Sequence, residues 1–144
     1  MFNSNLSVQD TDTLRDILTS AKVIAVVGYS DKPHRTSYQI GGFLKRVGYK
    51  VYAVNPTVES IDGETYYPSL AAVPEPIDIV NVFRRSEYLQ GVVDDAIAVG
   101  AKVVWAQLGV VDDWAAKAAV DAGLQVVMDR CIKVEYGRLG VAKV

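Results

Sequence analysis

The segment 28–37 gathers side chains that could bind a phosphate group. It contains several hydroxyl groups and three potential cations, Lys32, His34 and Arg35. An apolar pattern typical of a helix follows at once, and the first turn of a helix carries unpaired N–H groups and a positive dipole end that favour an anion. We therefore expect a phosphate site here, and a solvated surface loop of the same composition is the alternative.

The same segment lacks the pattern of an ordinary dinucleotide-binding loop. That pattern is Gly-x-Gly-x-x-Gly, with an acidic residue after the second strand to hold the ribose hydroxyls. Ser30 stands where the second glycine is required. The second predicted strand ends in Asn55 and Pro56, which provide an amide and a rigid turn but no carboxylate. Binding of NAD is therefore disfavoured.

Two further loops carry groups that could contact a ligand. Phe83 and Arg84 open a segment that combines an aromatic ring with guanidinium groups, where an adenine or a phosphate could rest. The alternative is that Phe83 belongs to the core and the arginines face solvent. Gln107 and Gly109 supply an amide and a flexible turn after a later strand, and a plain strand-to-helix turn would look the same.

Strand and helix patterns alternate along the chain and must position these loops. Continuous β-branched runs predict strands buried on both faces, and apolar residues at helical spacing predict the helices between them. Helix N-caps are expected at Asp12, Ser86 and Asp112. The predicted strands are residues 23–27, 50–54, 77–83, 102–106 and 125–128.

This alternation predicts parallel strands joined by right-handed crossovers. We expect one domain over residues 1–144, an α/β, Rossmann-like, doubly wound parallel sheet of five strands in the order 3-2-1-4-5, forming a three-layer sandwich. Ligands bind such sheets beyond the carboxyl ends of the strands, where the winding reverses. The loops after strands one and four should form that crevice, with the loops after strands two and three beside it.

Composition limits the class of partner. A net charge of −2 argues against a broad nucleic-acid footprint, and we find no apolar run long enough for a signal peptide or a membrane span. One cysteine and one histidine exclude an internal disulfide framework and the ordinary zinc sites. We therefore expect a cytoplasmic protein with a small-molecule ligand, no metal, no nucleic acid and no membrane. A homo-oligomer or a partner protein stays open.

The sequence resembles the small stand-alone CoA-binding proteins, whose fold is similar to the CoA-binding domain of succinyl-CoA synthetase α subunits. The resemblance covers nearly the whole chain. It rests on five blocks: Val-Val-Gly-Tyr-Ser at 26–30 with Arg-Thr-Ser-Tyr at 35–38, Gly48-Tyr49 to Val54-Asn55-Pro56, Asp78 to Val82-Phe83-Arg84, Val-Trp-Ala-Gln-Leu-Gly at 104–109, and Met-Asp-Arg-Cys-Ile-Lys at 128–133.

The resemblance implies a binding site for CoA or an acyl-CoA in the crevice. The segment 28–37 would surround the pyrophosphate, the loops after strands two and three would border the adenosine end, and the loop after strand four would lie along the pantetheine arm. The implied binding residues are Gly28, Tyr29, Ser30, Lys32, Arg35, Ser37, Asn55, Pro56, Phe83, Arg84, Gln107 and Gly109.

Three functions follow as hypotheses. The first is a non-catalytic or regulatory module that binds CoA or an acyl-CoA, because the crevice offers no evident acid–base pair beyond His34 and Asp31. The second is an enzyme that uses a nucleotide-type cofactor such as NAD in the same crevice. The third is a sensor that oligomerises through exposed tyrosines at 66 and 67, which could equally pack under their own loop.

Cys131 either forms a mixed disulfide with CoA or is a buried apolar residue.

Overall fold

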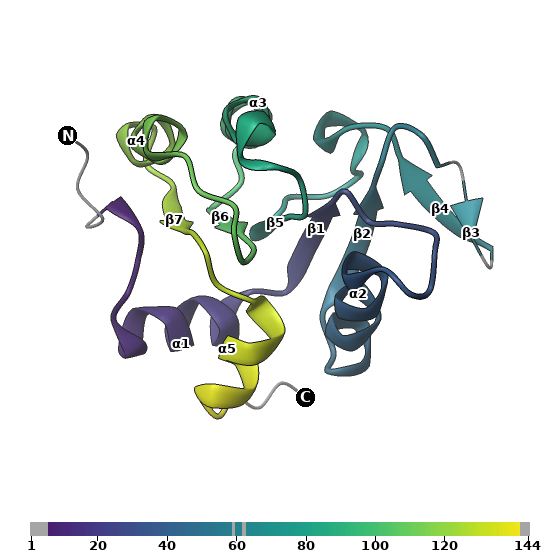
Figure 1. Ribbon diagram of the computed structural model, residues 1–144, viewed down its shortest axis with the longest axis horizontal. Coiled ribbons are helices and arrows are strands. Elements are labelled where there is room, and N and C mark those ends of the chain that lie inside the picture. The colour runs from purple at the N-terminus through teal and green to yellow at the C-terminus, as the bar shows by residue number, and fades with distance from the viewer. Residues whose placement is uncertain (1–5, 59, 62, 142–144) are drawn as a thin grey trace.

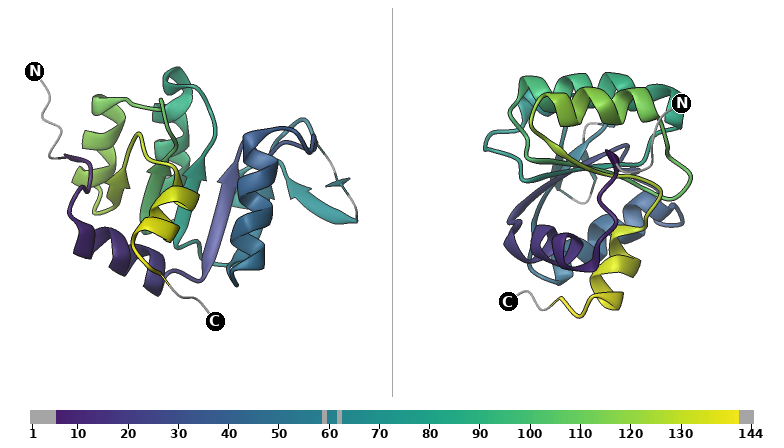
Figure 2. Two further views of the ribbon diagram at one scale, coloured as in Figure 1. Left: turned by 60° about the horizontal axis from the view of Figure 1, so that its bottom comes forward. Right: turned by 90° about the vertical axis from the view of Figure 1, so that its left-hand side faces the viewer.

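A computed structural model describes residues 6–58, 60–61 and 63–141. A central sheet separates two layers of helices (Figures 1 and 2). Helices α1, α2 and α5 cover one face, and α3 and α4 cover the other. The helices are α1 Thr11–Ser20, α2 Thr36–Arg46, α3 Leu89–Ala98, α4 Asp113–Asp121 and α5 Ile132–Arg138, with 3-10 turns at Leu70–Ala72 and Ser86–Tyr88.

The sheet contains seven strands in the order β3-β4-β2-β1-β5-β6-β7. All pairings are parallel except that between β3 and β4. The six parallel strands therefore run 3-2-1-4-5-6 when they are numbered in chain order. The strands are β1 Val23–Val27, β2 Lys50–Val54, β3 Ser60–Ile61, β4 Glu64–Tyr67, β5 Ile79–Val82, β6 Val103–Ala106 and β7 Gln125–Val127.

The predicted Rossmann-like, doubly wound sandwich is confirmed, with one parallel strand more than expected. The additional strand is β4, which pairs with the outer side of β2 and takes third place in the winding. The strand expected at 77–83 is consequently fourth, and β5 lies directly beside β1. The winding therefore reverses between β1 and β5, so the loops after these two strands flank the crevice.

Burial explains why the central strands form where the apolar runs predicted them. Every residue of β1, β5 and β6 is buried, as expected for parallel strands with helices on both sides. One apolar cluster lies under α3 and α4, and a second, built around Trp105, lies under α1, α2 and α5. None of the helices in the described part of the chain is long and apolar enough to cross a membrane.

Two of the three predicted helix caps were wrong. The cap of α1 is Asp10 rather than Asp12, because the Asp10 carboxylate accepts the Thr13 N–H at 2.9 Å. Ser86 begins a 3-10 turn instead of capping α3, and its hydroxyl forms hydrogen bonds with the backbone of the loop after β6. Asp112 caps α4 as predicted and accepts two backbone N–H groups.

Candidate functional site

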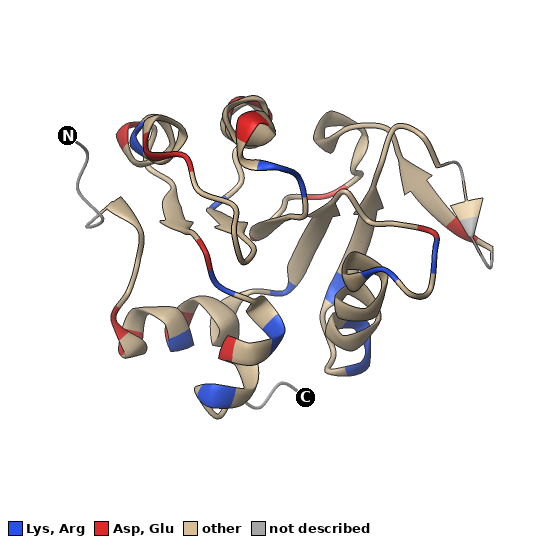
Figure 3. Ribbon diagram, in the orientation of Figure 1, with Lys and Arg blue, Asp and Glu red and all other residues tan. Residues whose placement is uncertain are grey.

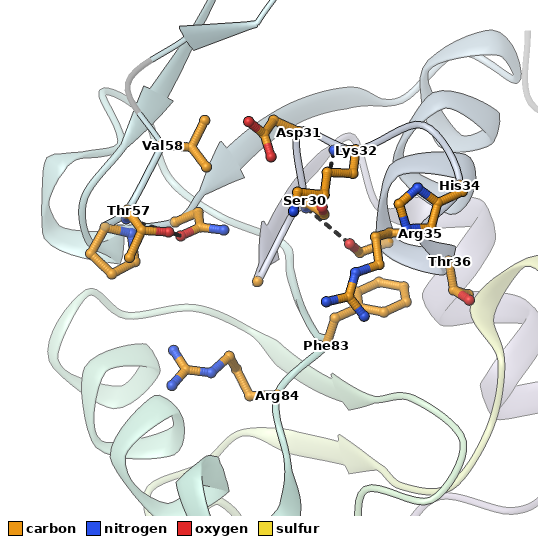
Figure 4. Close-up of a pocket in the computed structure, with 14 residues that line it drawn as sticks. Ser30, Asp31, Lys32, His34, Arg35, Thr36, Thr57, Val58, Phe83 and Arg84 are labelled. Carbon is orange, nitrogen blue, oxygen red and sulfur yellow. Dashed lines mark hydrogen bonds between the residues drawn. The ribbon is translucent and has the colours of Figure 1, made fainter.

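A cavity of about 840 Å³ lies at the carboxyl ends of β1, β2 and β5 (Figure 4). This is within the range of cofactor and small-ligand sites. Its position matches the point where the winding reverses. The lining residues are Gly28, Ser30, Asp31, Lys32, His34, Arg35, Thr36, Ser37, Asn55, Pro56, Thr57, Val58, Phe83 and Arg84.

Gly28 allows the two loops that flank the crevice to approach each other. It follows β1 with φ at +87°, a left-handed conformation that side chains disfavour. A Cβ atom at this position would also lie 2.6 Å from the backbone oxygen of Phe83. Only glycine therefore fits at this crossing between the end of β1 and the end of β5.

Hydrogen bonds within the chain hold the loop from Gly28 to α2 in a defined shape. The Ser37 hydroxyl accepts the Ser30 N–H at 2.9 Å, and the Ser30 hydroxyl accepts the Lys32 N–H at 3.1 Å. Tyr66 donates its hydroxyl to the Ser30 carbonyl at 3.2 Å. Burial raises the pKa of Tyr66, which keeps this donor neutral. The loop is therefore preorganised from beneath by a strand that sequence analysis missed.

The N-terminus of α2 opens into the cavity. Arg35 is its N-cap residue and makes no side-chain hydrogen bond to the first turn, whereas α1 and α4 each begin with a capping aspartate. Arg35, Thr36 and Ser37 all line the cavity. An uncapped helix start next to basic side chains provides N–H donors and a positive dipole end for an anion.

Three cations face this cavity without a carboxylate partner. Lys32, Arg35 and Arg84 form no ion pair with any residue that the structure describes. They come from loops after two different strands, and Figure 3 shows basic positions in both loops. Arg84 also lies 4.5 Å over the Tyr88 ring, which supports its extended side chain. The arrangement suits a ligand with more than one phosphate group.

Asn55 lies on the cavity wall, but its side-chain amide is hydrogen-bonded to neighbouring residues of the chain. Its Oδ1 accepts both the N–H and the hydroxyl of Thr57, and its Nδ2 donates to the Tyr29 carbonyl at 3.1 Å. Asn55 therefore shapes the turn after β2. Its neighbours Thr57 and Val58 also line the cavity, and sequence analysis did not single them out.

Tyr29 does not line the cavity. The ring is 3% exposed and packs edge-on against Tyr38 and Tyr66, with centroids 6.3 and 5.7 Å away. Helix α2 passes so close that a Cβ on Gly41 would lie 2.5 Å from Cζ of Tyr29. Tyr29 thus supports the loop from below. Tyr66 is buried as well, so this residue packs inside the protein and offers no exposed surface to the oligomerising sensor considered as the third hypothesis.

Gln107 and Gly109 also lie outside this cavity, one strand beyond β5. Gln107 is 6% exposed, and its Oε1 accepts the Ile132 N–H at 3.0 Å. The N–H of Gly109 donates to Asp129 at 2.7 Å. The expectation that the loop after β6 flanks the reversal point was wrong, because β4 shifts the reversal point to the gap between β1 and β5.

The two reactive side chains differ in their surroundings. His34 lines the cavity, is exposed, and its imidazole forms no hydrogen bond with a described residue. Cys131 is half-buried at the start of α5 and packs against the apolar cluster of that face. Within the described chain, no group of three or more His, Cys, Asp or Glu side chains could hold a metal ion.

A second cavity of about 420 Å³ adjoins the first and shares Pro56 and Arg84 with it. Its floor is apolar and includes Val27, Val54 and Leu70, all nearly fully buried. Two carboxylates and the Tyr88 ring stand on the α3 side. The two cavities together form a polar, basic chamber joined to a smaller and more apolar one.

Comparison with known proteins identifies the family of this chain. Residues 22–137 match the family model described as a CoA binding domain. The uncharacterized protein YneT of Bacillus subtilis is 44% identical over 123 residues, covering 85% of this chain and 91% of that protein. A hypothetical protein from Pyrococcus horikoshii is 40% identical with a TM-score of 0.88, covering 91% and 92% of the two chains. A Thermus thermophilus structure is 36% identical with a TM-score of 0.86, covering 91% and 99%. The chain therefore belongs to the CoA-binding domain family.

Proposed function

We propose that the protein binds coenzyme A or an acyl-CoA in the crevice between β1, β2 and β5, as a cytoplasmic binding or regulatory module. The observation that carries the proposal is that one cavity is lined by the uncapped start of α2 and by three cations without a carboxylate partner, Lys32, Arg35 and Arg84. A pyrophosphate at this point receives N–H groups, the helix dipole and guanidinium donors together. Membership of the family supports CoA as the source of that pyrophosphate.

The adjoining cavity suits the adenosine end of the ligand. Val54 and Leu70 give this cavity an apolar floor for a flat base, and the Arg84 and Tyr88 pair adds two planar faces to its lining. Pro56 and Arg84 line both cavities, so one bound nucleotide can extend from the first cavity into the second.

The state of Asn55 favours CoA over NAD. In dinucleotide-binding sheets an acidic residue at the end of the second strand holds the ribose hydroxyls. Here both ends of the Asn55 amide already bond Thr57 and Tyr29. A ribose placed there would meet no carboxylate from β2.

A binding role also agrees with the surroundings of His34. General acid–base catalysis requires a group held in reach of the reacting atom, usually oriented by a third residue. The His34 imidazole has no such hydrogen bond to a described residue, and Asp31, three residues earlier in the loop, is exposed. We therefore assign His34 to the wall of the phosphate chamber.

Calorimetric titration with CoA, acetyl-CoA, NAD and ATP tests the proposal. Saturable binding of CoA or acetyl-CoA, with weaker or no binding of NAD, is the expected result. Absence of heat and of a thermal shift with both CoA species would refute it. Tighter binding of NAD than of CoA would instead support the alternative, an enzyme with a nucleotide-type cofactor.

Substitution of Arg35 tests the position of the phosphate site. Arg35→Ala removes a charge-assisted hydrogen bond worth about 1.5 to 3 kcal/mol, which corresponds to about a 10- to 150-fold weaker Kd for CoA. Arg46→Ala at the other end of α2 is the matched control, because it removes the same charge outside the cavity. Equal effects of the two substitutions would place the phosphates elsewhere.

A further inference from the structure

Asn81 is a wholly buried polar residue in the middle of β5. It lies on the sheet face covered by α1, α2 and α5, since side chains alternate along a strand and Ile79 packs in that cluster. Its Nδ2 donates to the Trp105 carbonyl at 3.2 Å and to Oε1 of Gln107 at 3.1 Å. Its Oδ1 has no hydrogen-bond partner in the described structure.

An unpartnered buried acceptor disfavours the folded state, so a core position without another task would favour an apolar residue. The orientation of the amide is also fixed. Turning the Asn81 amide over would place its oxygen against the Trp105 carbonyl and Oε1 of Gln107, which are both acceptors. All hydrogen bonds of this side chain therefore come from its donor end, and that end faces Gln107.

Asn81 and α5 together fix the amide of Gln107. Its Oε1 accepts from Asn81 Nδ2 at 3.1 Å and from the Ile132 N–H at 3.0 Å. The Nε2 group must then point the opposite way, and it bonds to no described residue. Asn81 Oδ1 is the one unpartnered side-chain atom found fully buried in the described chain, so Nε2 of Gln107 is not fully buried.

This donor lies within reach of a ligand that starts in the phosphate chamber. Gln107 directly follows β6, which is the neighbour of β5, and β5 is the neighbour of β1. Strands in a sheet are about 4.8 Å apart, so the end of β6 is about 10 Å from the end of β1. The extended arm of CoA is longer than this. It offers amide carbonyls along its length, and an acyl-CoA adds a thioester carbonyl at its end.

We propose that Asn81 is a positioning residue that aims the Gln107 NH₂ group at a carbonyl oxygen of the ligand's arm. The proposal rests on the proposed binding of CoA and extends it to the recognition of the arm. Without Asn81, Oε1 of Gln107 keeps only the Ile132 N–H as a donor, so the amide is held less firmly with its NH₂ group outward. The pair therefore selects ligands that carry a hydrogen-bond acceptor on the arm.

Gln107→Glu tests the donor directly. Glutamate has nearly the same shape, and one carboxylate oxygen still accepts from Asn81 and Ile132, but the outward atom becomes an acceptor. The probes are CoA, acetyl-CoA and adenosine 3′-phosphate 5′-diphosphate, which is CoA without its arm. We expect CoA to bind about tenfold more weakly or worse, and the armless ligand to bind as it does to the wild type. A larger loss for acetyl-CoA than for CoA would identify the thioester carbonyl as the acceptor, and equal losses an arm amide.

Asn81→Leu tests the positioning role. Affinity for CoA should fall while affinity for the armless ligand stays unchanged, a selectivity that a general loss of structure would not produce. Because Asn81 acts through Gln107, Asn81→Leu combined with Gln107→Glu should bind CoA no worse than Gln107→Glu alone. Additive losses, or full CoA affinity in either single variant, would overturn the inference.

The side-chain amide signal of Gln107 gives a readout that does not depend on affinity. Gln107→Glu removes one NH₂ pair from the ¹H–¹⁵N spectrum and so assigns it. That pair should shift when CoA binds and stay in place with the armless ligand. If wild-type protein binds no CoA, the proposed function fails. If it binds CoA and the Gln107 signal does not move, the function stands and this inference alone fails.

Discussion

Gly41 and Gly42 are neighbours in α2, yet alanine should have opposite effects at the two positions. A Cβ on Gly42 would meet only the end of the flexible Arg46 side chain, at 3.3 Å. A Cβ on Gly41 would enter the ring of Tyr29, at 2.5 Å from Cζ and 2.7 Å from the hydroxyl oxygen. Tyr29 cannot yield easily, because it is buried beneath the phosphate loop.

The expected magnitudes follow from these two environments. Replacing glycine by alanine inside a helix stabilises it by about 0.8 to 1 kcal/mol. Gly42→Ala should keep most of this gain, so the free energy of unfolding should rise by about 0.5 to 1 kcal/mol. At Gly41 the same gain is opposed by overpacking, which costs about 1 to 3 kcal/mol and reaches the upper end for so close an overlap. Gly41→Ala should therefore lose about 2 kcal/mol.

Urea unfolding followed by circular dichroism measures both values under one set of conditions. The two variants share helix, neighbours and substitution, so their difference of about 3 kcal/mol isolates the contact with Tyr29. Gly41→Ala should also weaken CoA binding, since the ring that supports the loop must move. The reasoning is refuted if Gly41→Ala is as stable as the wild type, or if both variants lose stability equally.

Two further substitutions test the structure around the site. Gly28→Ala should lower the free energy of unfolding by about 1 to 2 kcal/mol because of its left-handed backbone, and by more because of the overlap with Phe83. Gly123 has φ at +91° and open space around it, so Gly123→Ala should show only the backbone cost in urea unfolding. Burial alone would raise the pKa of Asp78, but two backbone N–H groups and Lys102 outweigh it and lower that pKa below its usual value. The ionised carboxylate therefore adds stability above about pH 4, and this is lost as pH falls through the lower folded pKa. Asp78→Asn should be about 1 kcal/mol less stable than the wild type at pH 7 and about equal at pH 2, and the same deficit at both would contradict this account.

The central strands were predictable because their local pattern leaves little choice. Val23–Val27 is a continuous β-branched run, which requires apolar cover on both faces. Glu64–Tyr67 was not recognised, because it is short, half polar and set beside a turn. Its pairing with β2 depends on tertiary contacts, and this single strand determines where the winding reverses.

The residues of the candidate site also differ in how far the sequence could predict their positions. Lys32, Arg35 and Arg84 were predictable because each lies in a loop that follows a strand, and the carboxyl ends of parallel strands share one edge. The positions of Tyr29 and Gln107 were not, since the depth of a side chain depends on which helix packs over it. Asn81 did leave a signal that was overlooked. A single amide side chain between Val80 and Val82 is a polar group inside a buried strand, and such a group requires a structural or functional explanation.

Mapping CoA onto the protein by ¹H–¹⁵N spectroscopy tests the central claim most directly. Addition of CoA should shift the backbone amides of residues 28–37 and of Arg84 in a saturable manner, with the first turn of α2 affected most. Amides of α4, which lie outside both cavities of the crevice, should stay in place and serve as the internal control. Saturable shifts confined to other parts of the chain, or no saturable shift at all, would contradict the account.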